Sequence, residues 1–201
     1  MLSFMMKDES IVAYYDAAYM VVVSFLSLLI RPFNLFLFPA YTKRYKNEGE
    51  ASTVSMVTRA QNLFIFLGIG LATIIVVLRI PILEILFPSG YITGASIFAP
   101  VAFSILLNGV FMATVAGLYL TDKTVKVGTA SLLAMAINII ANYILIPLYG
   151  MDGAAYGTAI ASLAQLGIAY GYSRSSLPVK LPIVFLLFGG FWLLFIQWLI
   201  A

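Results

Sequence analysis

The sequence predicts an all-α fold, a polytopic transmembrane bundle of about six helices. Of its 201 residues, 63% are hydrophobic and only 9% are charged, whereas soluble domains are about 45–50% apolar and about 25% charged. The mean hydropathy is +1.05. The apolar residues also form six long runs, each near the ~20 residues that a helix needs to cross a bilayer. Runs of this length without two-residue alternation favour helices over strands.

The whole chain, 1–201, is predicted to form one transmembrane bundle. The predicted spans are 11–40, 56–79, 94–120, 125–147, 153–173 and 181–200. Turn residues and charges separate them, namely KRYKNEGE at 43–50, FPSGY at 87–91, TDKTVK at 121–126, YGMDG at 149–153 and SRSSLPVK at 173–180. Residues 81–87 are expected to form a short helix at the membrane surface. In the fifth span Gly153, Gly157 and Ala161 recur every four positions, a spacing that allows a close helix–helix contact.

The distribution of basic residues predicts the orientation in the membrane. Eight of the eleven lysines and arginines lie in or beside three loops, near 43–59, 121–126 and 174–180. Because cytoplasmic loops carry an excess of lysine and arginine, these three loops are expected to face the cytoplasm. The sequence therefore predicts a multi-pass protein of the cytoplasmic membrane, with both ends of this chain facing outward.

Polar side chains gather along one side of the first span. At about 100° per residue, all of them fall within less than half of the helix circumference. They are Asp16, Tyr19, Ser24, Ser27, Arg31 and Asn34. A helix surrounded by lipid has no reason to collect its polar groups on one side, so this side is expected to meet protein or water.

Arg31 is the most unusual residue of this polar side. A charge at the centre of a bilayer costs about 2.5–3.5 kcal/mol on insertion scales, and the cytoplasmic basic cluster lies ~18 Å away along the helix, too far for the side chain to reach. Three interpretations stay open. In the first, Arg31 pairs with a carboxylate, such as Asp16 or one on a missing neighbour. In the second, it contacts an anionic substrate in a hydrated cavity. In the third, the span boundary is misplaced. Arginine suits a phosphate because its planar fork donates two hydrogen bonds at once.

Other candidates are weaker. Asn138 and Asn142 share one side of the fourth span and are candidates for lining the same cavity, although amides in spans are commonly contacts between helices. Asp16 is a candidate for ion coupling, but a carboxylate near a helix N-terminus is stabilised there without any further role.

The composition gives enzymatic function little support. The chain has no cysteine and no histidine, which removes thiol nucleophiles, imidazole bases and most transition-metal sites. No Walker A motif, H-E-x-x-H motif or glycine-rich nucleotide loop is present. We therefore expect no catalytic residue, no metal, no cofactor and no nucleic-acid partner.

The segment 138–162, NIIANYILIPLYGMDGAAYGTAIAS, resembles a family of membrane transporters. It is similar to the polysaccharide biosynthesis branch of the MOP superfamily, the O-antigen and lipid-linked oligosaccharide flippases that are related to MATE exporters. Two further matches are VAYYDAAYM at 12–20, with Ala13 where the family usually has glycine, and the Phe38-Pro39 pair before a basic loop.

The resemblance implies the C-terminal half of a two-lobe flippase, with residues 1–6 as the end of a preceding helix. The implied substrate is a polyprenyl-diphosphate-linked oligosaccharide, and the implied partners are membrane lipids and a missing N-terminal lobe or partner subunit. Two alternatives remain open, a MATE-type cation-coupled drug exporter and a truncated membrane subunit that does not transport. Substrate charge distinguishes the two transporters, because a cationic drug would prefer Asp16 and avoid Arg31.

Overall fold

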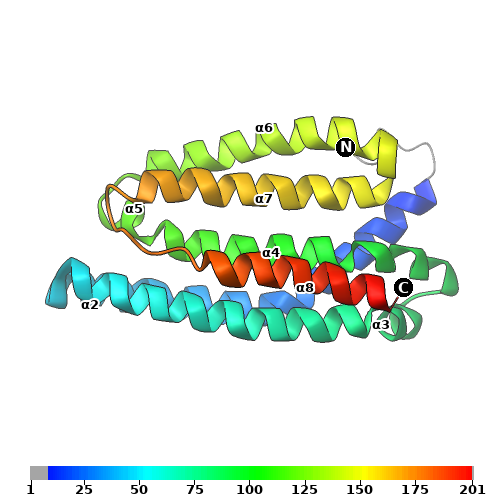
Figure 1. Ribbon diagram of the computed structural model, residues 1–201, viewed down its shortest axis with the longest axis horizontal. Helices are drawn as coiled ribbons and strands as arrows, with labels where there is room; N and C mark the ends of the chain where they lie inside the picture. The colour runs from blue at the N-terminus through cyan, green and yellow to red at the C-terminus, as the bar shows by residue number, and fades with distance from the viewer. Residues whose placement is uncertain (1–8, 201) are drawn as a thin grey trace.

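The all-α prediction is confirmed. The computed structural model describes residues 9–200, and these residues form helices joined by short turns, with no strand among them (Figure 1). The elements in chain order are α2 (Glu9–Val77), α3 (Arg79–Leu86), the 3-10 helix η1 (Ser89–Ile97), α4 (Phe98–Thr114), α5 (Ala116–Leu120), α6 (Thr124–Tyr149), α7 (Met151–Ser173) and α8 (Ile183–Leu199). The helix end expected at residues 1–6 lies outside the described residues.

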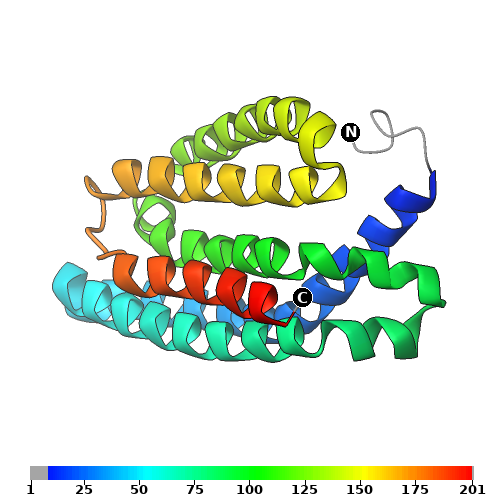
Figure 2. The same ribbon diagram turned by 45° about the vertical axis from the view of Figure 1, so that its right-hand side comes forward.

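Helix α2 consists of two arms that meet at Gly49. There the backbone leaves the helical region, with φ 81° and ψ −172°, a conformation that is essentially restricted to glycine. The first arm (9–48) and the second arm (50–77) then run side by side (Figures 1 and 2), and the rings of Phe33 and Phe64 join them at a centroid distance of 4.7 Å. The expectation of a non-helical basic loop at 43–50 is wrong, because only Gly49 departs from helical geometry.

Three helices in the described part of the chain are long and apolar enough to cross a membrane. They are Glu9–Val77, Ser89–Leu120 and Thr124–Tyr149, and Ile183–Leu199 is a shorter apolar helix. The apolar stretch predicted at 94–120 is not one regular helix, since it contains the end of η1, the whole of α4 and the short α5. The short helix expected at 81–87 is present as α3.

Helix α4 forms the centre of the bundle and contacts α2, α7 and α8. Most of its side chains are buried, among them Phe98, Leu107 and Phe111. Helices α6 and α7 form a hairpin on one side of α4, and the two arms of α2 lie on the other (Figures 1 and 2). This arrangement gives the apolar faces of the long helices a common core.

The α6–α7 hairpin confirms the contact predicted from small-residue spacing. Gly150, with φ 60°, reverses the chain between the two helices. Gly153 and Gly157 of α7 are buried, and a β-carbon at either position would collide with Leu145 or Asn142 of α6, respectively. Glycine is therefore required at position 153, where the obstacle is backbone, whereas a β-carbon at position 157 would displace the side chain of Asn142.

The three basic connections lie at one end of the bundle, at the left of Figure 1. This end holds the reversal of α2, the turn after α5 and the segment between α7 and α8. Lys123 Nζ donates a hydrogen bond of 2.9 Å to Ser176 Oγ and so joins the second and third connections. We refer to this end as the basic end, and to the end that holds α3 and η1 as the opposite end.

Candidate functional site

The polar side of the first arm of α2 faces away from the core. The arm buries Ala18, Val22 and Leu26 completely, each with 0% exposure. These residues lie on the side of the helix that is about opposite to Arg31 at 100° per residue. The grouping of polar residues that the sequence predicted therefore corresponds to an outward side of this bundle.

The structure places the individual candidates on that outward side or at its edges. Asp16 and Arg31 are exposed, whereas Tyr19, Ser27 and Asn34 are half-buried. Ser27 Oγ donates a hydrogen bond of 2.8 Å to the Ser24 carbonyl of its own helix. The ring of Tyr19 stacks on that of Tyr15 at 5.9 Å.

Arg31 has no carboxylate partner in the described part of the chain. Among residues 9–200, the one ion pair joins Arg44 to Glu48. Asp16 and Arg31 are carried by one uninterrupted helical arm, so their fifteen-residue separation corresponds to ~22 Å along the axis. The interpretation that Arg31 pairs with Asp16 is therefore excluded.

The expectation that helices of this chain enclose Arg31 is also corrected. Arg31 and its neighbour Pro32 are exposed on the bundle surface, because the first arm turns its apolar side toward α4 and leaves its polar side without a covering helix. The arm remains helical through Pro32. Any cavity around Arg31 thus has to be completed by something other than residues 9–200.

Asn138 and Asn142 are not brought to Arg31. Asn142 is 8% exposed, its Nδ2 donates to Asn138 Oδ1 at 3.0 Å, and it lies against Gly157 of α7. In both views α6 lies on the far side of α7 from α2 (Figures 1 and 2). Asn142 therefore lies in the α6–α7 contact, and Asn138 is hydrogen-bonded to it within α6.

A buried polar contact that the sequence analysis did not single out joins three helices near the basic end. Gln61 of α2 is fully buried, and its Nε2 donates to Thr114 Oγ1 of α4 at 3.2 Å. Ser173 Oγ of α7 donates to the Thr114 carbonyl at 2.7 Å. Gln61, the one glutamine of the predicted span 56–79, was the available signal for this contact.

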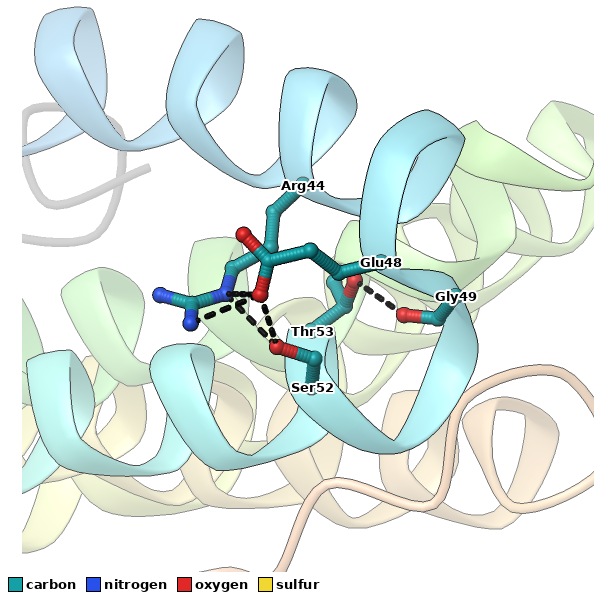
Figure 3. Close-up of polar contacts among 5 residues, drawn as sticks. All are labelled: Arg44, Glu48, Gly49, Ser52 and Thr53. Carbon is teal, nitrogen blue, oxygen red and sulfur yellow. Dashed lines mark hydrogen bonds and ion pairs between the residues drawn. The ribbon is translucent and has the colours of Figure 1, made fainter.

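The reversal of α2 is stabilised by a second polar cluster (Figure 3). Arg44 pairs with Glu48 at 2.8 Å, and Ser52 Oγ donates to the same Glu48 oxygen at 2.6 Å. The hydrogen bond from Ser52, and then Arg44, lower the pKa of Glu48. The pKa of Glu48 is thus lower in the folded state than in the unfolded state, and the ionised carboxylate stabilises the fold. This stabilisation is present at neutral pH and is lost as the pH falls through the pKa of the folded state.

A third cluster holds α8 at the opposite end. Arg79 is 4% exposed, and its guanidinium donates to the carbonyls of Val76, Gln197 and Ile200 at 3.0, 3.4 and 3.1 Å, respectively. The Gln197 side chain accepts from Ala99 N at 2.8 Å and donates to the Ser96 carbonyl at 2.5 Å. No pattern in the sequence singled out Arg79, which stands at the end of the predicted span 56–79.

Within residues 9–200 no three side chains of histidine, cysteine, aspartate or glutamate gather in a way that would hold a metal ion. The chain matches no protein-family model, no curated protein and no solved structure.

Proposed function

We propose that this chain is one lobe of a membrane flippase that moves a polyprenyl-diphosphate-linked oligosaccharide across the cytoplasmic membrane for cell-surface polysaccharide synthesis. The diphosphate would contact Arg31 on the polar side of the first α2 arm, with Ser27, Asn34 and Tyr19 beside it. The prenyl tail would remain in lipid at the edge of the cavity. The basic end would face the cytoplasm.

The observation that supports this proposal most is that Arg31, within a long apolar helix, is exposed and has no carboxylate partner among residues 9–200. Facing acyl chains, this charge would cost several kcal/mol, on the order of 2.5–3.5. A second lobe placed against the polar side would remove that cost by enclosing water around the guanidinium. An anionic headgroup would then find a permanent cation with two parallel donors.

The mechanism that this arrangement supports is alternating access, in which two lobes rock around a substrate site near the middle of the bilayer. The lobe formed by this chain has a tightly packed core around α4, so it suits movement as a rigid body. The partner would be a second lobe, carried on the same polypeptide or by a separate subunit. Without a nucleotide-binding motif, we expect the movement to be driven by an ion gradient or by consumption of the product, with Asp16 as the candidate for ion coupling.

A translocation assay in proteoliposomes, with a labelled polyprenyl-diphosphate sugar, tests the proposal. We expect Arg31→Ala to reduce flipping at least tenfold, and Arg31→Lys to retain part of the activity because it keeps the charge but loses the planar fork. Arg174→Ala is the control, since Arg174 is an exposed cation at the basic end, and it should leave flipping unchanged.

Three results would contradict the proposal. Normal flipping by Arg31→Ala would remove the role of the guanidinium. No flipping by the wild-type chain together with its partner would instead favour the alternative of a non-transporting subunit. Export of a cationic drug that depends on Asp16, with no effect of Arg31 substitutions, would favour the MATE-type exporter.

A further inference from the structure

The basic end carries a hollow lined by two arginines between the arms of α2. Its volume is about 460 Å³, and its polar lining comes from Arg44, Ser52, Ser55 and Arg59. Arg59 is exposed and has no side-chain partner among the described residues. Arg44 uses Nε and Nη2 to hold Glu48 and Ser52, which leaves its Nη1 available to donate. With Glu48 counted, the hollow keeps a net positive charge.

This hollow continues into an apolar groove between the same two arms. The groove has a volume of about 480 Å³ and is lined by Pro32, Phe36 and Ala40 of the first arm, among others. Met56, Ala60 and Leu63 of the second arm line both the hollow and the groove. A cationic, hydroxyl-bearing site and an almost wholly apolar channel are thus parts of one continuous depression.

The length of this depression matches one lipid chain. From Leu28 to Ala40, the groove lining covers thirteen residues of helix, and the twelve steps between them rise ~18 Å. One leaflet of a bilayer contributes about half of its ~30 Å hydrocarbon thickness. Arg44 and Arg59 lie at the predicted ends of the spans, where lipid headgroups are found, and the groove runs from them toward the middle of the membrane.

We propose that this depression binds one anionic phospholipid, with its phosphate on Arg59 and Arg44 and one acyl chain in the groove between the arms of α2. Basic pockets between helices on the cytoplasmic side of a membrane bind anionic headgroups in this way. A free phosphate would leave the apolar groove unfilled, and a zwitterionic lipid would place its own cation beside two arginines. The site does not depend on transport, so it stands or falls separately from the proposed function.

Native mass spectrometry of the full chain in detergent, titrated with phosphatidylglycerol or phosphatidylcholine of the same chain length, tests the site. We expect one phosphatidylglycerol to be retained in preference to phosphatidylcholine. Arg59→Gln should weaken phosphatidylglycerol binding about fivefold, since a cation near an anionic lipid contributes that factor. Glycerol phosphate, which has the headgroup charge but no chains, should not compete.

Matched variants separate the site from general effects of charge and bulk. Arg174→Gln removes one exposed cation from the same end without touching the hollow, and it should bind as the wild type does. Ala40→Trp fills the groove and should abolish the retained lipid, whereas Ala136→Trp adds the same bulk on the exposed side of α6 and should not. Ala40 is exposed, so its substitution leaves the buried core intact.

Equal retention of the two lipids would overturn the proposal, and so would an Arg59→Gln variant that binds as tightly as the wild type. Displacement by glycerol phosphate, or binding that survives Ala40→Trp, would assign the hollow to a free anion instead. Preferential binding of a prenyl diphosphate would reassign the groove to the transport substrate. Loss of flipping by Arg31→Ala together with normal binding of phosphatidylglycerol would show that the two sites are distinct.

Discussion

Replacing Arg79 with alanine is expected to lower the free energy of unfolding by about 1.5–3 kcal/mol, the range for hydrogen bonds to a charged group. The buried guanidinium joins the carbonyl of Val76, in the last turn of α2, to those of Gln197 and Ile200 at the end of α8. Helix C-termini leave their last carbonyls without intrahelical partners and attract cations. Alanine would remove the bonds that join the two helix ends and would leave the buried Val76 carbonyl without the guanidinium donor.

Denaturation in detergent micelles, followed by circular dichroism, measures this effect. Arg79→Lys should lose about 1 kcal/mol, because an ammonium group keeps the charge but cannot reach all three carbonyls in the same plane. Arg174→Ala is the matched control, and as a surface substitution it should change stability by about 0.5 kcal/mol or less. If Arg79→Ala were as stable as the wild type, the role assigned to Arg79 would be wrong.

The second large effect is expected from Gly153→Ala in the α6–α7 hairpin. The added β-carbon would collide with the carbonyl group of Leu145, which is backbone and cannot rotate away. Overpacking of this kind costs about 1–3 kcal/mol, and here it would also separate the two helices. We therefore expect a lower midpoint of thermal unfolding than in the wild type.

Two glycines of the same helix provide the control. A β-carbon on Gly167 or Gly171 would meet nothing within 4 Å, and alanine is favoured over glycine within a helix by up to about 1 kcal/mol. Gly167→Ala and Gly171→Ala should thus be neutral or stabilising. Glycine-to-alanine substitution in one helix is therefore expected to lower stability at position 153 but not at positions 167 and 171. A stabilising effect of Gly153→Ala would contradict the close contact between α6 and α7.

Much of the fold could be predicted because its signals are local. Hydropathy located the apolar helices, and the glycines at 150, 153 and 157 indicated a tight hairpin. The single reversal at Gly49 was harder, since the charged residues around it are good helix formers and an Arg44–Glu48 pair supports the helix at i, i+4 spacing. Polarity alone suggested a loop there.

The role of Arg79 was not predictable from the sequence for a different reason. Its partners at Gln197 and Ile200 lie 118 and 121 residues away, and no local pattern connects them. The candidate site was predictable only in part. Angular spacing correctly grouped the polar residues of the first arm on one side, but whether that side faces inward depends on how the arm packs against α4. The direction of Asn142 depends in the same way on packing, because the side chain lies toward α7 where Gly157 leaves room for it.

The proposed function requires that the side of α2 bearing Arg31 meets enclosed water and not acyl chains. Because the chain has no cysteine, single cysteines can be introduced at Ser27, Arg31 and Asn34, and at Ile140 as an exposed, apolar reference on α6. A charged thiol reagent modifies the thiolate, which forms only where water reaches the sulfur. In membranes that hold the protein with its partner, we predict modification at the three α2 positions at least tenfold faster than at position 140. Rates at positions 27, 31 and 34 as slow as the rate at position 140 would show that this side of α2 faces lipid and would contradict the proposed function.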